Sequence, residues 1–168
     1  MVGSSARNSD SYKVTTPSDT EIHMTRLFDA PRALVFEAMT KPEHIREWWG
    51  RLGEGYSVPV CEVDFRIGGR WRFVNRHPRG DAAFHGEYRE IAAPERVVFT
   101  EIFEAFPDTV SVVTSMLTEE AGKTRLTVTV RYPSIEVRNA VVESGMARGA
   151  GISYDRLEDL VELLQQAK

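Results

Sequence analysis

Apolar and polar residues alternate through most of the middle of the chain, which is typical of strands with one buried face. The pattern predicts strands over 21–28, 58–67, 70–76, 83–91, 96–103, 110–118 and 124–132. Short connections rich in Gly, Pro and Asp separate the last six runs, so an antiparallel meander is expected. Two short helices are predicted between the first two strands, and a long helix is predicted from about Ile135 to Gln166.

The segment EVDFRIGGRWRF (62–73) has a Gly-Gly pair between two alternating runs. A two-residue turn would mix aromatic residues and arginines on both faces of the hairpin. A three-residue loop would instead pair Ile67 with Trp71 and Phe65 with Phe73, giving one apolar face. We therefore predict the three-residue loop.

Side-chain parity extends this apolar face across the sheet. It places Phe84 with Tyr88, Phe99 with Glu101, and Met116 with its apolar neighbours on the buried side. An antiparallel sheet with one apolar face needs a cover. The long C-terminal helix is expected to provide it.

The C-terminal helix is apolar near its end but small near its start. Toward the start of the helix, the side that carries the apolar residues of the last turns continues with Ser153, Ala150, Gly149 and Met146. Small residues permit either close packing on the sheet or a cavity. An empty void of ~300 Å³ would cost about 7 kcal/mol, so water or a ligand would have to occupy it. We predict the cavity.

The predicted ligand-binding residues come from the apolar face, the start of the helix and a tryptophan at the entrance. They are Trp49, Trp71, Phe73, Phe84, Tyr88, Phe99, Met116, Met146, Gly149 and Ser153. Glu101 is the candidate catalytic residue, because a carboxyl group that faces an apolar cavity has a raised pKa and can act as an acid or base. Asn75 or His77 would then orient the substrate. Alternatively, a bulge or the strand end returns Glu101 to water.

The composition indicates an ordinary globular domain. With 168 residues and a net charge of −4, the chain suggests one domain and no nucleic-acid partner. No apolar run is long enough for membrane insertion. Cys61 is the only cysteine, which fits a reducing, cytoplasmic location. Residues 1–18 lack the apolar block of a signal peptide and are predicted to be a flexible tail, so that 19–168 form the domain.

Metal and cofactor chemistry is not indicated. The histidines, His23, His44, His77 and His85, show no ligand spacing with cysteine or carboxylate partners. The Gly-Gly pair lies between strands, whereas phosphate-binding loops precede helices. We expect no metal and no cofactor, and Cys61 is interpreted as a structural thiol.

Several stretches are more specific: FDAPRALVFEAMTKPEHIREWW (28–49), DFRIGGRWRF (64–73), FHGEYREIAAPERVVFT (84–100), KTRLTVTV (123–130) and GMARGAGISYDRL (145–157). In this order they resemble the homologues of the heat-shock protein 90 ATPase activator, within the START-like or SRPBCC (birch-pollen-allergen-like) superfamily. The resemblance implies an α+β helix-grip fold. In that fold a curved antiparallel sheet packs against two short helices and a long C-terminal helix.

The resemblance also implies a range of functions. Relatives bind lipids, hormones or polyketides, and some are cyclases, aromatases or hydrolases. The function predicted for this chain is binding of a small apolar molecule between sheet and helix. The alternatives are a cyclase- or hydrolase-like enzyme that uses Glu101, and an interaction protein with a chaperone partner. A monomer and a homodimer are both compatible with the sequence.

Overall fold

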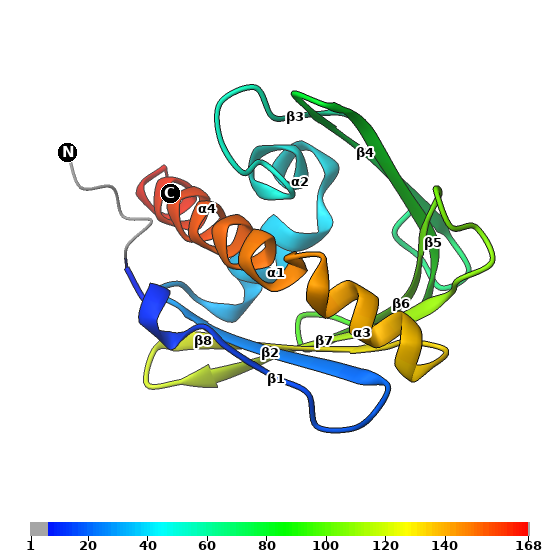
Figure 1. Cartoon of the computed structure of the whole chain (residues 1–168). Coiled ribbons are helices and arrows are strands. Elements are labelled where there is room, and N and C mark those ends of the chain that lie inside the picture. Colours follow the sequence, from blue (N-terminus) through cyan, green and yellow to red (C-terminus); the bar gives the residue numbers. More distant parts are fainter. Residues whose placement is uncertain (1–6, 168) are drawn as a thin grey trace.

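The computed structural model describes residues 7–167, and in this range one antiparallel sheet curves around the helices (Figure 1). Its elements in chain order are η2 (Ser9–Ser11), β1 (Lys13–Thr15), β2 (Glu21–Phe28), α1 (Arg32–Thr40), α2 (Pro42–Trp48), β3 (Ser57–Val63), β4 (Arg70–His77), β5 (Gly80–Ala92), β6 (Arg96–Phe103), β7 (Ser111–Glu120), β8 (Lys123–Arg131), α3 (Ile135–Glu143) and α4 (Met146–Gln166). The strand order is β1-β2-β8-β7-β6-β5-β4-β3. The predicted α+β helix-grip architecture is confirmed.

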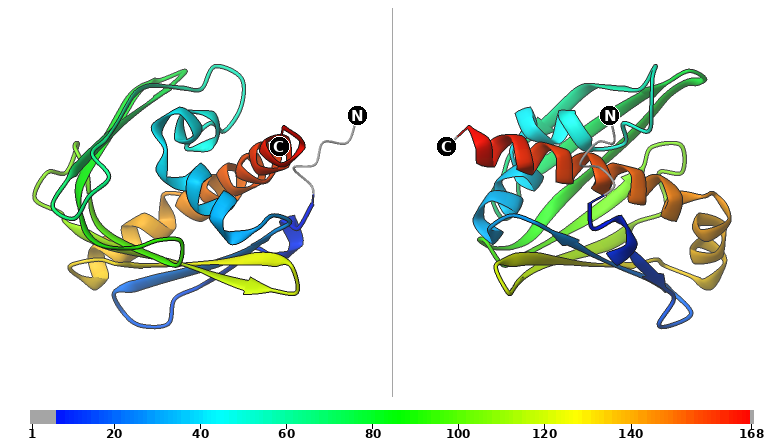
Figure 2. Two further views of the ribbon diagram at one scale, coloured as in Figure 1. Left: turned by 180° about the vertical axis from the view of Figure 1, so that it is seen from behind. Right: turned by 90° about the vertical axis from the view of Figure 1, so that its left-hand side faces the viewer.

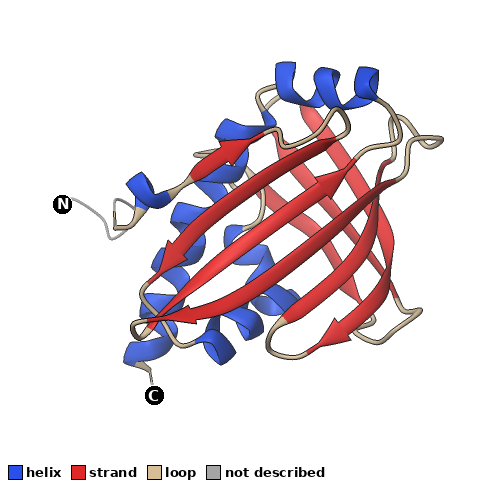
Figure 3. Ribbon diagram, turned by 90° about the horizontal axis from the view of Figure 1, so that it is seen from below, coloured by secondary structure: helices blue, strands red, loops and turns tan. Residues whose placement is uncertain are grey.

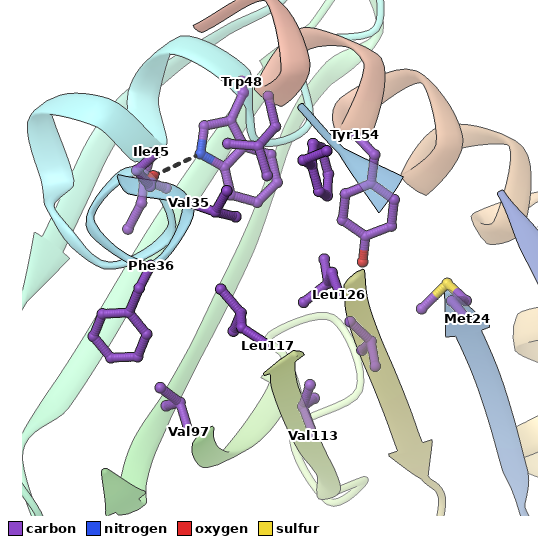
Figure 4. Packing of buried hydrophobic residues seen from close by; sticks show 14 of the residues in the cluster. Met24, Val35, Phe36, Ile45, Trp48, Val97, Val113, Leu117, Leu126 and Tyr154 are labelled. Carbon is purple, nitrogen blue, oxygen red and sulfur yellow. Dashed lines mark hydrogen bonds between the residues drawn. The ribbon is translucent and has the colours of Figure 1, made fainter. Parts of the chain in front are cut away.

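The helices fill the concave side of the sheet (Figures 2 and 3). α4 packs against α1 and α2, and α1 in turn contacts β7 and β8. The core lies between these helices and the sheet (Figure 4). Leu126 of β8 and Leu157 of α4 are fully buried there, and each such side chain contributes about 1.5–3 kcal/mol of hydrophobic stabilisation. No helix in the described range is long and apolar enough to cross a bilayer.

A buried ion pair that the sequence did not reveal joins β2 to α4. Arg26 and Glu158 are both almost fully shielded from water, and their side chains approach to 3.2 Å. The same guanidinium pairs with Asp155 at 2.8 Å, and Glu158 accepts a hydrogen bond from the Asp29 backbone N–H. Because a buried charge without its partner is costly, this network fixes the C-terminal half of α4 on the sheet.

The register predicted for the first hairpin is wrong. Trp71 pairs with Val63, not with Ile67, and Ile67 is 64% exposed. The segment between β3 and β4 folds onto β5 instead, where it exchanges two backbone hydrogen bonds with Tyr88. A Cβ at Gly69 would lie 2.0 Å from the Asp64 carbonyl oxygen, so this close turn requires glycine.

The flexible tail predicted for residues 1–18 is corrected for the part that the structure describes. Ser9–Ser11 form η2, and Lys13–Thr15 form β1 at the edge of the sheet, paired with β2. Between these elements, the hydroxyl of Tyr12 donates a hydrogen bond to the Ala147 carbonyl of α4. Residues 1–6 lie outside the described range.

The single helix predicted from Ile135 to Gln166 is two helices, α3 and α4. Gly145 separates them with a left-handed backbone, φ 83°, a conformation that glycine adopts without steric cost. α3 has no fully buried residue, whereas α4 buries five side chains. The break allows α3 to lie at a different angle, beside the ends of β6–β8 (Figure 1).

Candidate ligand-binding site

Six of the predicted ligand-binding residues form one continuous aromatic surface on the concave face. Strand pairing creates it, since Phe73 lies opposite Phe84, and Tyr88 lies opposite Phe99. Ring centroids are 4.7 Å apart for Trp71–Phe73, 5.1 Å for Trp49–Phe73, 5.3 Å for Trp49–Phe84, 5.5 Å for Trp71–Phe99 and 6.1 Å for Tyr88–Phe99. Trp48, the residue before Trp49, is buried in the core.

This aromatic surface is incompletely covered. Phe84, Phe99 and Glu101 point to the concave side but keep partial exposure, whereas Val97 and Val113 nearby are buried. The residues that face the core from α3 and the start of α4 are also only half-buried: Val137, Val141 and Met146. The part of the concave face formed by β5–β8 is therefore the part that the helices cover least.

Glu101 lies on this concave face, as parity predicted. Strand pairing places it opposite Ser111 of β7. Burial raises the pKa of the Glu101 carboxyl to about 7, because the ionised form loses its hydration without gaining a cation. No residue from 7 to 167 makes a hydrogen bond or an ion pair with this carboxyl group.

Two tyrosines that the sequence analysis missed lie within reach of the Glu101 charge. Burial, followed by the charge of Glu101, raises the pKa of Tyr132, which directly follows β8. For Tyr154 of α4 the causes of the raised pKa are burial, then Tyr12, then Glu101. Figure 4 shows the Tyr154 ring pointing from α4 toward the sheet. Parity with Val130 could have identified Tyr132, but nothing local marks Tyr154.

Met116 does not belong to the site, which corrects the prediction. It is 41% exposed and pairs with Arg96 and Thr127 on the convex face. The concave residues of β7 are Ser111, Val113, Ser115 and Leu117. Valine, serine and threonine alternate on both faces of this strand, so parity alone could not show which face is buried. Pairing with β8 decides it.

Gly149 and Ser153 contact a loop and do not line an open space. The nearest atom to a Cβ built on Gly149 is a methyl group of Leu52, at 3.5 Å. The hydroxyl of Ser153 accepts a hydrogen bond from the Gly50 N–H at 3.0 Å. Asn75 donates to the carbonyl of the same glycine at 2.9 Å. Close packing, the alternative to the predicted cavity, is what these small residues provide.

Met146 borders a surface cleft of about 250 Å³ between β1 and the α3–α4 junction. Its lining is Val14, Thr15, Thr16, Ile22, Val142, Met146 and Ala147. The cleft is mainly apolar, and it lies at the opposite edge of the sheet from the aromatic surface.

The remaining reactive groups have structural partners. Cys61 is a buried free thiol whose pKa burial raises to about 11. His77 lies against Tyr56 with ring centroids 6.2 Å apart. On the convex face, Arg72 binds Glu104 through two hydrogen bonds, which together with His85 lower the pKa of Glu104 to about 2. None of these groups contributes to the raised pKa of Glu101.

Comparison with known proteins gives consistent matches over most of the chain. A family model described as "Activator of Hsp90 ATPase homolog 1-like protein" matches residues 29–162. A crystal structure from Rhodobacter sphaeroides is 25% identical, with a TM-score of 0.82 over 90% of this chain and 99% of that one. A structure from Mycobacterium smegmatis is 28% identical, with a TM-score of 0.79 over 88% and 94% of the two chains. No curated protein matches the sequence.

Proposed function

The chain belongs to the Activator of Hsp90 ATPase homolog 1-like family, and on this premise we propose that it binds a small, largely apolar molecule. The binding site is the concave face between β5–β8 and α3 with the start of α4. The observation that carries this proposal is the Glu101 carboxyl group, which has no protein partner beside an incompletely covered aromatic surface. Buried polar groups are hydrogen-bonded in native proteins, so water or a ligand must supply the missing partner.

The surroundings of Glu101 suit a ligand with a large apolar part. Phe84 and Phe99 present half-buried rings, and covering apolar area that water still touches gains about 25 cal/mol per Å². Such sites are mostly apolar, with a few polar groups that orient the ligand. α3 can move more readily than α4, because none of its residues is fully buried.

The test uses N-phenyl-1-naphthylamine, an uncharged probe whose fluorescence increases in apolar surroundings. Val141 is half-buried and packs against the core, while its neighbour Val142 lines the cleft near β1. We expect the wild type to bind the probe, Val141→Trp to lose binding by filling the concave site, and Val142→Trp to retain it. Circular dichroism and urea unfolding establish that both variants are folded.

The opposite result, in which Val142→Trp alone loses binding, would move the site to the cleft and overturn the proposed location. If the wild type binds no probe, and native mass spectrometry of the protein purified from its source shows no retained small molecule, the proposed function is wrong. Should Val141→Trp not fold, Val137→Trp on the same helix tests the same space.

A second candidate is an enzyme, because Glu101 with a pKa of about 7 is suited to donate or accept a proton near neutral pH. The predicted orienting residues do not support it, since Asn75 is engaged with Gly50. The hydroxyls of Tyr132 and Tyr154 would have to take that role. Once a bound molecule is identified, Glu101→Gln should retain its binding and abolish its conversion.

A chaperone partner is supported only by the family description. Addition of the purified chain to purified Hsp90 tests it directly. No change in ATP hydrolysis and no co-migration on gel filtration would exclude this function for the pair tested.

A further inference from the structure

A row of polar groups lies across the concave face. Glu101 on β6 pairs with Ser111 on β7. Val112 of β7 pairs with Arg131 of β8. Tyr132 follows Arg131, and so it lies beside Ser111, the residue before Val112. Tyr154, on α4, lies within reach of the Glu101 charge. We call Glu101, Ser111, Tyr132 and Tyr154 the polar cluster.

The hydroxyl groups of this cluster lack protein partners. Tyr132 and Tyr154 are each 8% exposed and Ser111 is 6% exposed, so all three are more than nine-tenths buried. None of their hydroxyls hydrogen-bonds to a residue in the described range 7–167, and none belongs to the polar atoms that are sealed from water without a partner. These hydroxyls therefore border space that a solvent molecule or a ligand atom can reach.

The cluster contains an acidic side chain but no positively charged one. Arg26, the basic residue that is buried among residues 7–167, is already paired with Asp155 and Glu158. No cation contributes to the pKa of Glu101, and its only perturbation is burial. The site therefore offers the negative charge of the Glu101 carboxylate and hydroxyl groups that can accept or donate a hydrogen bond, with aromatic rings close by. Such rings attract cations through their faces.

We propose that the polar cluster selects an apolar ligand whose polar end is a hydrogen-bond donor, foremost a protonated amine, and rejects carboxylates and phosphates. This proposal rests on the proposed function. An ammonium group would neutralise Glu101 and donate to the tyrosine and serine hydroxyls. An anion would meet a like charge at low local dielectric, where repulsion is strong.

The experiment compares three probes that share a naphthylmethyl group: the amine 1-naphthylmethylamine, the alcohol 1-naphthylmethanol and the carboxylate 1-naphthaleneacetate. Binding is measured at pH 7.5 by isothermal titration calorimetry and by the tryptophan fluorescence of the protein. We expect the amine to bind at least about tenfold more tightly than the acetate. Glu101→Gln should remove this preference and leave the affinity for the alcohol nearly unchanged.

Tyrosine variants provide a matched control. Tyr132→Phe should weaken binding of the amine and the alcohol. Tyr56→Phe should not, because Tyr56 precedes the edge strand β3 and its ring lies against His77, outside the polar cluster and the aromatic surface. If Glu101→Gln does not fold, Ser111→Ala and Tyr132→Phe still test the cluster.

The possible failures are distinguishable. Equal affinities for amine and acetate, or a preference that persists in Glu101→Gln, would overturn the selectivity while the binding function stands. Binding of none of the three probes at millimolar concentration, together with failure of the uncharged fluorescent probe, would contradict the proposed function itself.

Discussion

Replacing Glu101 by glutamine should stabilise the protein above neutral pH. The unfolded carboxyl titrates at 4.5, whereas burial raises its pKa in the folded protein to about 7. Between these values the folded state keeps a proton that the unfolded state has lost, so stability falls as the pH rises. At ~1.4 kcal/mol per pKa unit, the ionised carboxylate costs the wild type about 3 kcal/mol above pH 7. Glutamine carries no such cost.

Urea unfolding at pH 4.5 and pH 8, followed by tryptophan fluorescence, measures the effect. The free energy of unfolding of Glu101→Gln relative to the wild type should increase by about 3 kcal/mol between the two pH values. Probe-free protein is required, because a bound cation would stabilise the carboxylate. A difference that stays constant, or that decreases toward pH 8, would refute the burial of this carboxyl.

Glu104→Gln is the matched control. Arg72 and His85 hold the pKa of Glu104 at about 2, below the unfolded value. Its stabilisation is therefore complete above pH 4.5 and is lost only as the pH falls toward 2. Between pH 4.5 and pH 8 the difference between this variant and the wild type should stay nearly constant.

Other substitutions test the scaffold around the site. Arg26→Met should lower the free energy of unfolding by about 3–5 kcal/mol because it leaves Glu158 buried without a partner, and Arg26→Met with Glu158→Leu should recover part of the loss in urea titrations. Gly86→Ala should cost at least about 2 kcal/mol, since its Cβ would lie 1.8 Å from the Thr100 carbonyl oxygen. Gly53→Ala, with no atom within 4 Å, should stay within ~0.5 kcal/mol of the wild type; similar melting temperatures for the two alanine variants would contradict the close approach of β5 and β6. Gly145→Ala should lower the free energy of unfolding by about 1 kcal/mol because Gly145 has a left-handed backbone. Backbone hydrogen exchange in this variant should be faster in α3 than in α4. Equal protection of the two helices would show that α3 is not the weaker cover.

The sequence determined most of the fold and part of the site. Alternation within long strands was sufficient to assign β2, β6 and β8 and to place Phe99 and Glu101 on one face. The aromatic residues of β4 and β5 were correctly assigned to the concave side even though the hairpin register was wrong. The partners of Trp71 and Phe73 lie four residues earlier than predicted, an even number, and so these two side chains keep their face, whereas Ile67 is exposed.

Only the tertiary structure decided which polar groups meet. The residue types of β7 around Met116 suit either face of the sheet. The pairing of β7 with β8 places Met116 on the convex face, not on the predicted concave one. Tyr154 reaches the charge of Glu101 from a helix 53 positions further along the chain, and Arg26 reaches Glu158 across 132 positions. Periodicity reports which residues of one element share a face. The partners of that face depend on long-range packing, because a buried polar group is stabilised by whatever the folded chain brings within a few ångströms of it.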